Sequence, residues 1–265
     1  MKKILAAVAL TLLVAATAAA DLRGAWTAES ESSGKLQMNL TYRANQHGET
    51  MLVSDFSGLT QPVVDAAVQP PVNFQLRREA GSIAFEGTFK NGIGAGQFTF
   101  TPSSDYAATL RSLGVTFRKD GDDPVDRNLL TMTLLDVSTA YIRSMQAEGF
   151  RETAEKYVEM RIFKVTPEYV RAMRAAGYPD LTAQQLVESR IHGATPEFIS
   201  QMKAIGYDNV PFRQLVEFRI FKVTPEFVRE LKDAGYEHVP ARKLVEMRIQ
   251  GIDAGYIKRM NATKK

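Results

Sequence analysis

The amino-acid sequence predicts an α+β protein in which a small antiparallel β sandwich or partial barrel is followed by an array of α-helical hairpins, a short α-solenoid. Two observations carry this prediction. Apolar and polar residues alternate between about residues 24 and 100, which is the period of half-buried strands. Beyond residue 100, similar segments recur every 29 residues, which is typical of stacked supersecondary units. We therefore expect a β domain over residues 21–100 and a helical repeat array over residues 101–265.

The first twenty residues have the layout of a secretory signal peptide. Two lysines precede an apolar stretch from Ile4 to Leu13, and a run of small residues ends at Ala20. We expect cleavage before Asp21, which predicts a periplasmic or secreted protein with no transmembrane span in the mature chain. An uncleaved anchor is the alternative, because the apolar segment is close to the roughly 17 residues that can span a bilayer.

Composition and charge narrow the function classes. The chain has no cysteine, so disulfides, thiolate metal sites and cysteine nucleophiles are excluded. Its 33 basic and 30 acidic residues give a net charge of +3, of which the leader contributes two. A mature chain so close to neutral lacks the basic footprint expected of a nucleic-acid-binding protein.

Three segments of the β domain show the alternation most clearly: "KLQMNLTY" from Lys35, "VNFQL" from Val72 and "SIAFEGTF" from Ser82. Asn91-Gly92 is a two-residue hairpin signal, because both central positions of that turn require positive φ. Further turns are expected at His47-Gly48, Gly58 and Ala80-Gly81. These breaks predict about six strands.

The tripeptide Gly24-Ala25-Trp26 resembles the G-x-W sequence that opens the first strand of lipocalin-like barrels. That resemblance implies a cupped barrel with Trp26 near its floor. The alternative is a tryptophan that fills the core of an ordinary β domain.

The helical array holds about five units and a terminal half, "IDAGYIKRM". Its period appears in three sets of equivalent positions: Thr166, Thr195, Thr224 and Asp253; Gly177, Gly206 and Gly235; and Arg161, Arg190, Arg219 and Arg248.

Each unit predicts two short helices. Thr166 is placed to cap the first helix, Pro167 suits its first turn, and Gly177 supplies the left-handed residue that ends it. A second helix begins near Thr182 and is expected to bury an apolar stripe, comprising Leu186, Val187 and Ile191. Neither helix reaches the roughly 12 to 15 residues that an isolated helix needs in water, so stacking must stabilise them.

The units end alternately in "IFK" and in "IHG" or "IQG". If Gly193 and Gly251 adopt positive φ, Lys164 and Lys222 are expected to close their helices in another geometry, because a Cβ costs about 1 kcal/mol there.

The sequence contains no recognisable catalytic motif. His47, His192 and His238 are scattered and have no metal-ligand spacing, and no phosphate loop or nucleophile elbow is present. We therefore expect no enzyme activity, no cofactor and no metal site, with one possibility left open. The acidic cluster Asp120, Asp122, Asp123 and Asp126 fits either a calcium site or a solvated connector.

Two rows of basic residues follow the repeat. The arginines of the second helices, Arg161, Arg190, Arg219 and Arg248, are expected to reach a carboxylate or a helix C-terminus in a neighbouring unit, with an anion-binding row as the alternative. The outer face of the first helices carries candidate binding residues for an acidic partner, although interleaved glutamates also fit a merely solvated face. These candidates are Arg143, Arg171, Arg174, Lys203, Arg229, Lys232 and Lys258.

The skeleton T-P-E-[FY]…G-Y…L-V-E-x-R-I over residues 101–265 resembles helical repeats of exported bacterial proteins and of the extracytoplasmic tails of some β-lactam-sensor-type membrane metallopeptidases. The resemblance implies an accessory or sensory interaction role and carries over no active site. The leading interpretation is therefore a non-enzymatic module that binds a protein or an anionic envelope polymer through its array. A small-molecule or lipid carrier that uses the β domain is the alternative.

Overall fold

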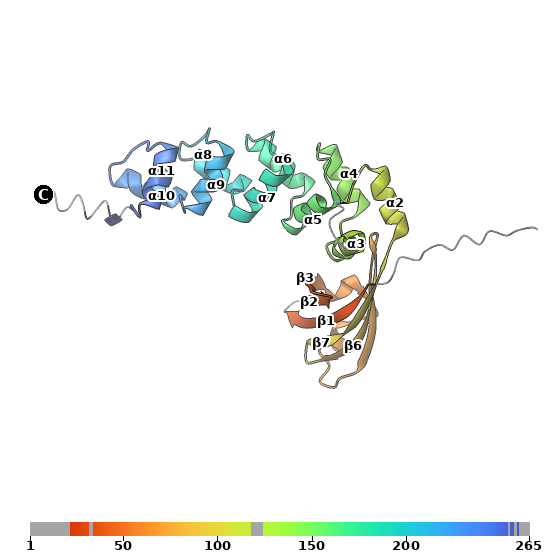
Figure 1. Cartoon of the computed structure of the whole chain (residues 1–265). Helices are drawn as coiled ribbons and strands as arrows, with labels where there is room; N and C mark the ends of the chain where they lie inside the picture. The colour runs from red at the N-terminus through yellow and green to blue at the C-terminus, as the bar shows by residue number, and fades with distance from the viewer. Residues whose placement is uncertain (1–21, 32–33, 118–123, 254, 257–258, 260–265) are drawn as a thin grey trace, which may run out of the picture. The chain divides into compact units, whose positions relative to one another are not determined.

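The computed structural model describes residues 22–31, 34–117, 124–253, 255–256 and 259 of the 265-residue chain. The chain divides into two compact units, a β unit of residues 1–77 and 82–102 and a helical unit of residues 78–81 and 103–265. The predicted α+β class is confirmed (Figure 1). The predicted leader lies outside the described residues, as do Asp120, Asp122 and Asp123 of the acidic cluster.

The β unit is a single curled seven-stranded sheet in the order β3-β2-β1-β7-β6-β5-β4. This is a partial barrel rather than a sandwich, and it has one strand more than the sequence suggested. Short helical segments, η1 (Val53–Asp55) and α1 (Gln61–Val64), flank β4. The strands are β1 (Leu22–Glu31), β2 (Lys35–Tyr42), β3 (Asn45–Leu52), β4 (Phe56–Ser57), β5 (Pro71–Arg78), β6 (Gly81–Lys90) and β7 (Ile93–Pro102).

The strands of the sheet turn at all but one of the positions that the sequence predicted. Asn91 and Gly92 join β6 to β7 with φ of 49° and 82°, as the hairpin signal predicted. The turn expected at His47-Gly48 is wrong, because both residues lie inside β3. The chain turns earlier, at Arg43, which adopts a φ of 51°. His47 instead stacks on Tyr42, with ring centroids 5.7 Å apart, and this contact favours the observed register.

Aromatic side chains form the core of the β unit. Trp26 is 1% exposed and lies edge-on to Phe74 and Phe85, with ring centroids 5.3 and 6.1 Å away. Its indole nitrogen donates to the Glu86 carbonyl at 3.1 Å, so its one polar atom is satisfied. The strands approach closely there: a Cβ on Gly87 would lie 2.7 Å from the indole ring. Trp26 is therefore an integral part of a packed interior.

The helical unit contains ten helices in the described residues, and consecutive pairs form the repeats. Helices α2 and α3 form the degenerate first unit that the sequence suggested. The helices are α2 (Ser104–Ser112), α3 (Pro124–Leu134), α4 (Thr139–Ala147), α5 (Ala154–Ile162), α6 (Pro167–Ala175), α7 (Ala183–His192), α8 (Pro196–Lys203), α9 (Phe212–Ile220), α10 (Pro225–Asp233) and α11 (Ala241–Ile249).

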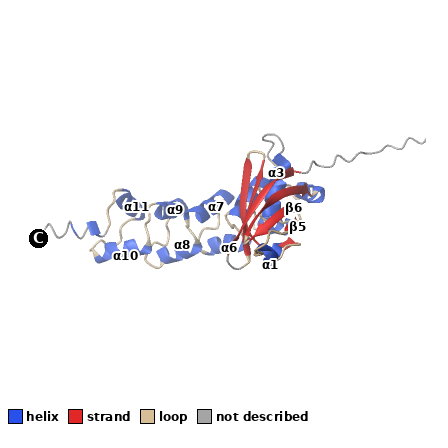
Figure 2. Cartoon of the chain, turned by 90° about the horizontal axis from the view of Figure 1, so that it is seen from below, coloured by secondary structure: helices blue, strands red, loops and turns tan. Residues whose placement is uncertain are grey.

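Stacking places the helices of the repeats in two rows. Helix α7 contacts α5 and α9, and α9 contacts α11, so the second helices of successive units form one row. Figure 2 shows this row beside the row of first helices, α6, α8 and α10. Among the described residues, no helix has the length and apolarity needed to cross a bilayer.

The predicted helix starts are confirmed by side-chain caps. Thr166 accepts a hydrogen bond from the amide of Tyr169, and Thr195 and Thr224 cap α8 and α10 in the same way. Thr182 and Gln185 form the expected capping box at the start of α7. Each cap satisfies amides that would otherwise lack a partner in the first turn.

The expectation that Lys164 and Lys222 end their helices in a different geometry from Gly193 and Gly251 is wrong. Lys164 and Lys222 adopt φ of 54° and 55°, the same left-handed conformation as Gly193 at 77° and Gly251 at 69°. Tertiary packing imposes this geometry, because the residue that follows must turn into the core: Val165 is fully buried, and its amide bonds back to the Met160 carbonyl at 2.8 Å. The lysines accept a conformation that a glycine would adopt without strain.

Candidate binding surfaces of the helical array

The second-helix arginines connect neighbouring units. Each side chain lies over the aromatic ring of the first helix in its own unit and donates to a carbonyl at the end of the second helix in the preceding unit. Arg190 shows the closest contact, with Cζ 3.6 Å from the Tyr169 ring centroid and a 3.0 Å bond to the Lys164 carbonyl. The equivalent donor–acceptor pairs are Arg161 to Leu135, Arg219 to His192 and Arg248 to Phe221.

This arrangement confirms that the arginines reach a helix C-terminus, one of the two partners expected from the sequence. A cation is favourable there, because the last carbonyls carry partial negative charge. The ring below adds a cation–π contact, as for Arg219 over Phe198 and Arg248 over Phe227. The guanidinium groups therefore hold the stacking geometry and are already engaged by the protein.

Tyrosines make a second connection between units, at the opposite end of the second helices. The Tyr178 hydroxyl donates to the Val210 carbonyl at 2.6 Å, and the Tyr207 hydroxyl donates to the Val239 carbonyl at 2.7 Å. Tyr236 occupies the same position in the last complete unit and is 45% exposed.

The predicted basic row on the first helices is partly neutralised. Glu148, at the end of α4, accepts hydrogen bonds from both Arg171 and Arg174 of the next first helix. The Arg171 bond, followed by the effect of Arg174, holds the pKa of the Glu148 carboxyl below its usual value. Arg229 pairs with Glu226 of its own helix at 2.6 Å. An anionic partner would have to compete with these carboxylates.

The other candidates of the basic row have different environments. Arg143 is exposed and Lys203 is half-buried, with its ammonium beside Gly177. Lys232 is exposed and makes no ion pair within the described part of the chain. Lys258 lies outside the described residues. The geometry thus separates the six candidates that the structure describes rather than joining them into one uniform anion site.

A row of isoleucines is the surface feature that sequence reasoning missed. Ile191 was expected in the buried stripe of α7, but it is 52% exposed. It follows Leu186 by five positions, roughly 140° around the helix, and so reaches the edge of the buried arc. The equivalent isoleucines are exposed to a similar extent: Ile162 50%, Ile220 48% and Ile249 59%.

The row was visible as the recurring pair Arg-Ile, every 29 residues. Other exposed positions of these helices vary between units: Gln184, Arg213 and Arg242 share one such position. The isoleucine is thus repeated at an exposed position in four successive units, whereas its exposed neighbours are not.

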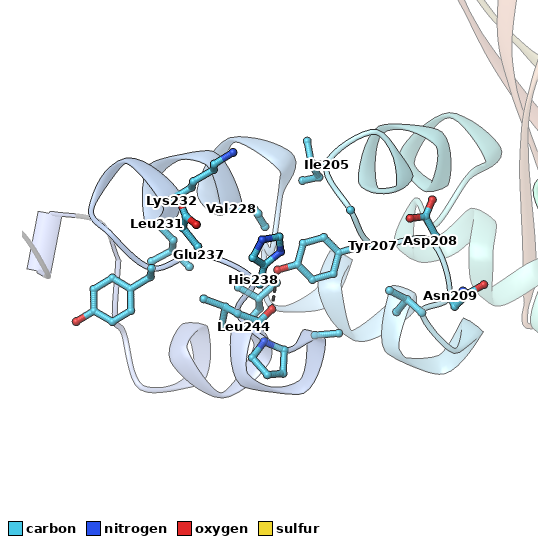
Figure 3. Close-up of a pocket in the computed structure, with 16 residues that line it drawn as sticks. Ile205, Tyr207, Asp208, Asn209, Val228, Leu231, Lys232, Glu237, His238 and Leu244 are labelled. Atoms are coloured by element: carbon cyan, nitrogen blue, oxygen red, sulfur yellow. Dashed lines mark hydrogen bonds between the residues drawn. The ribbon is translucent and has the colours of Figure 1, made fainter.

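A groove of about 440 Å³ lies between the last two complete units, next to the tyrosine connection. Figure 3 shows Tyr207 and His238 beside each other in the groove, with Ile205 and Lys232 nearer one end and Leu244 nearer the other. Val210 and Leu231 contribute buried apolar surface. None of the row isoleucines lines it, so the groove is a separate feature.

The histidines do not converge. His47 lies in the β unit against Tyr42, His192 ends α7, and His238 lines the groove with a φ of 50°. The described residues contain no group of three or more histidine and acidic side chains that could hold a metal ion. Of the acidic cluster, Asp126 alone is described, at the start of α3.

The β unit offers a shallow hollow of about 330 Å³. Its lining includes polar residues of β5 together with Gly58 and Glu86, and the buried rings of Phe74 and Phe85 form part of its wall.

No protein-family model, curated protein or solved structure matches the chain.

Proposed function

We propose that the protein is an exported interaction module that binds a partner protein through its helical array. The observation that carries the proposal is the row Ile162, Ile191, Ile220 and Ile249, in which equivalent side chains in four successive units remain about half exposed. Stacked repeats of this kind generally present an extended surface to their partners.

The chemistry of the row favours a protein partner with an apolar segment. When a partner covers a half-exposed isoleucine, the buried apolar area stabilises the complex by about 25 cal/mol per Å². The guanidinium groups beside the row already bond to backbone carbonyls, so they add little capacity for a polyanion. For this reason we favour a protein over an anionic envelope polymer.

The runner-up, a small-molecule or lipid carrier, would require an apolar cavity in the β unit. Trp26, Phe74, Phe85 and Phe89 contact one another and are each at most 2% exposed. Such packing supports the interaction module. The proposal involves no catalytic step and no cofactor.

Export is part of the proposal, and it depends on the leader-like residues 1–20. The amino-terminal sequence of the protein recovered from cells tests it. We expect the first residue to be Asp21, and an intact leader would contradict cleavage.

Site-specific photocrosslinking tests the binding surface. A photoreactive amino acid at Ile191 or Ile220 should give one discrete crosslinked species in intact cells, from both positions. The matched controls are Gln184 and Arg213, exposed residues on the same two helices away from the row. Equal crosslinking from the control positions, or none from the row, would overturn the proposal. Ile191→Asp should abolish the crosslink from position 220, because it places a charge in the centre of the row.

A further inference from the structure

The two edges of the sheet in the β unit differ. At one edge, β4 is two residues long and is flanked by η1 and α1. At the other edge, β3 is eight residues long, and its neighbour in the described sheet is β2 alone (Figure 1). The sequence of β3, "NQHGETML", contains no proline or lysine, the residues that commonly prevent an edge strand from pairing with another chain. The backbone of β3 is therefore open to a further strand.

Alternate residues of β3 direct their backbone groups away from β2. The Val53 amide donates to the Gly34 carbonyl at 2.9 Å, and this bond fixes the alternation: odd-numbered residues of β3 bond to β2, and even-numbered residues point outward. The outward amide of Leu52 is already bonded, to the Asp55 carboxylate at 3.0 Å. The amides and carbonyls of three exposed residues then have no strand partner in the described sheet: Gln46, Gly48 and Thr50.

The spacing of these three residues is self-complementary. In an antiparallel pair of two β3 strands centred on Gly48, Gln46 lies opposite Thr50 of the second copy, and Gly48 lies opposite its own equivalent. Each of these is a hydrogen-bonded pair, so every outward amide of one copy meets an outward carbonyl of the other. The central residue has no side chain to obstruct the twofold axis.

The side chains favour the same register. His47 lies opposite Glu49 of the second copy, and this contact occurs twice because of the symmetry. The two residues form a pair without hydrogen bonds between their backbones, the kind in which side chains approach most closely. If one strand slides by two residues, Glu49 lies opposite Glu49 or His47 opposite His47, and like charges in such pairs are destabilising. Either slide also leaves outward groups of Gln46 or Thr50 without a matching partner.

We propose that β3 pairs with β3 of a second copy of this chain, antiparallel about Gly48, and so joins the β units of two chains into one continuous sheet. Charge complementarity and the match of donors to acceptors favour a second copy over a strand of another protein. This inference goes beyond the proposed function, because β3 and the isoleucine row belong to different compact units.

Cysteine exchange tests the register. The chain has no cysteine, so Gln46→Cys and Thr50→Cys each introduce a single thiol at an exposed position. In the proposed pair, positions 46 and 50 of different copies lie about 5.5 Å apart at Cα, which a disulfide can span. Two copies of the same variant keep their thiols about 13 Å apart, four residues along the strand.

Mild oxidation of the mixed variants should therefore give a disulfide-linked dimer on a non-reducing gel, and oxidation of either variant alone should not. No crosslink from the mixture would overturn the proposal. Crosslinks of equal yield from a single variant would contradict the register centred on Gly48.

Sedimentation velocity of the purified protein tests the association itself. We expect a concentration-dependent equilibrium between monomer and dimer. Thr50→Pro removes an outward amide without removing a bond to β2, and proline is tolerated at such edge positions. It should weaken the dimer about tenfold or more, because the symmetry removes two hydrogen bonds at once. Circular dichroism checks that the variant is folded, and the cysteine exchange tests the proposal without proline.

Thr50→Val is the matched control. It removes the hydroxyl that donates to Gln37 at 2.6 Å but keeps the amide, so the dimer should be unaltered. Equal association of the wild type and a folded Thr50→Pro would place the contact elsewhere and overturn the proposal. A wild type that stays monomeric at every concentration would also overturn it, and would leave the edge to a strand of another protein.

The isoleucine row and the β3 edge can fail separately. Ile191→Asp should leave the dimer unaltered while it abolishes the crosslink expected of the row. Thr50→Pro should weaken the dimer and leave that crosslink in place. Loss of the dimer in a folded Ile191→Asp variant would contradict pairing through β3.

Discussion

The guanidinium carbon of Arg190 lies 3.6 Å from the centroid of the Tyr169 ring. The same group donates to the Lys164 carbonyl, so one side chain joins two helices of its own unit to the end of the preceding unit. Units too small to fold singly depend on such connections for cooperative stability.

Replacement of Arg190 by methionine should therefore destabilise the protein. We expect a loss of about 1 to 3 kcal/mol in the free energy of unfolding, from the cation–π contact and the charged hydrogen bond. Urea denaturation followed by circular dichroism measures it. Arg213→Met is the control, since that side chain is 92% exposed, and a change of similar size in both variants would contradict the role given to Arg190.

The tyrosine connection predicts a graded pair of substitutions. Tyr207→Phe removes a hydroxyl bonded to the Val239 carbonyl and should cost about 1 kcal/mol. Tyr236→Phe removes the equivalent hydroxyl where it is exposed, and should change stability by less than about 0.5 kcal/mol. The free energies of unfolding of both variants test this. Equal losses would show that the hydroxyl of Tyr207 does not hold the units together.

Substitutions at two residues with positive φ, Lys222 and Gly193, should change the free energy of unfolding in opposite directions. Lys222→Gly should raise the free energy of unfolding by up to about 1 kcal/mol, because glycine adopts positive φ without the Cβ penalty. Gly193→Ala should lower it by about 1 kcal/mol or more, since the new Cβ would also lie 3.2 Å from the Arg219 guanidinium. Thermal unfolding of both variants measures the effect. A lower melting temperature for Lys222→Gly would contradict the strain argument.

We expect the array to lose stability in acid partly because the Glu148 carboxylate becomes protonated. Its pKa is lowered in the folded state, chiefly by the hydrogen bond from Arg171. The stabilisation is therefore present above the unfolded-state pKa and is lost as the pH falls through the lower folded-state pKa. Glu148→Gln should be less stable than the wild type at pH 7, and the difference should shrink below about pH 4.5, the usual glutamate pKa.

Unfolding free energies measured between pH 7 and pH 3 test the Glu148 prediction. The control is Glu230→Gln, which changes an exposed carboxylate on α10. A constant difference between the wild type and Glu148→Gln across this range would contradict it.

The sequence by itself determined the division into a β region and a helical region, the 29-residue repeat and most helix starts. These features are encoded locally: alternation in the strand "KLQMNLTY", the hairpin signal Asn91-Gly92 and the cap at Thr166 each act within a few residues. Local chemistry could not place the turn before β3, because Arg43 carries no strong turn signal and the pairing of Tyr42 with Asn45 depends on the neighbouring strand.

Only the tertiary structure decided which repeated residues are engaged and which face solvent. Arg171 and Arg229 are equivalent in sequence and each pairs with a glutamate of its own helix, yet only Arg171 also pairs across the unit boundary, with Glu148. Ile191 is exposed and Lys164 is left-handed because of how neighbouring units pack. The groove depends on the same packing, since residues from two successive units line it.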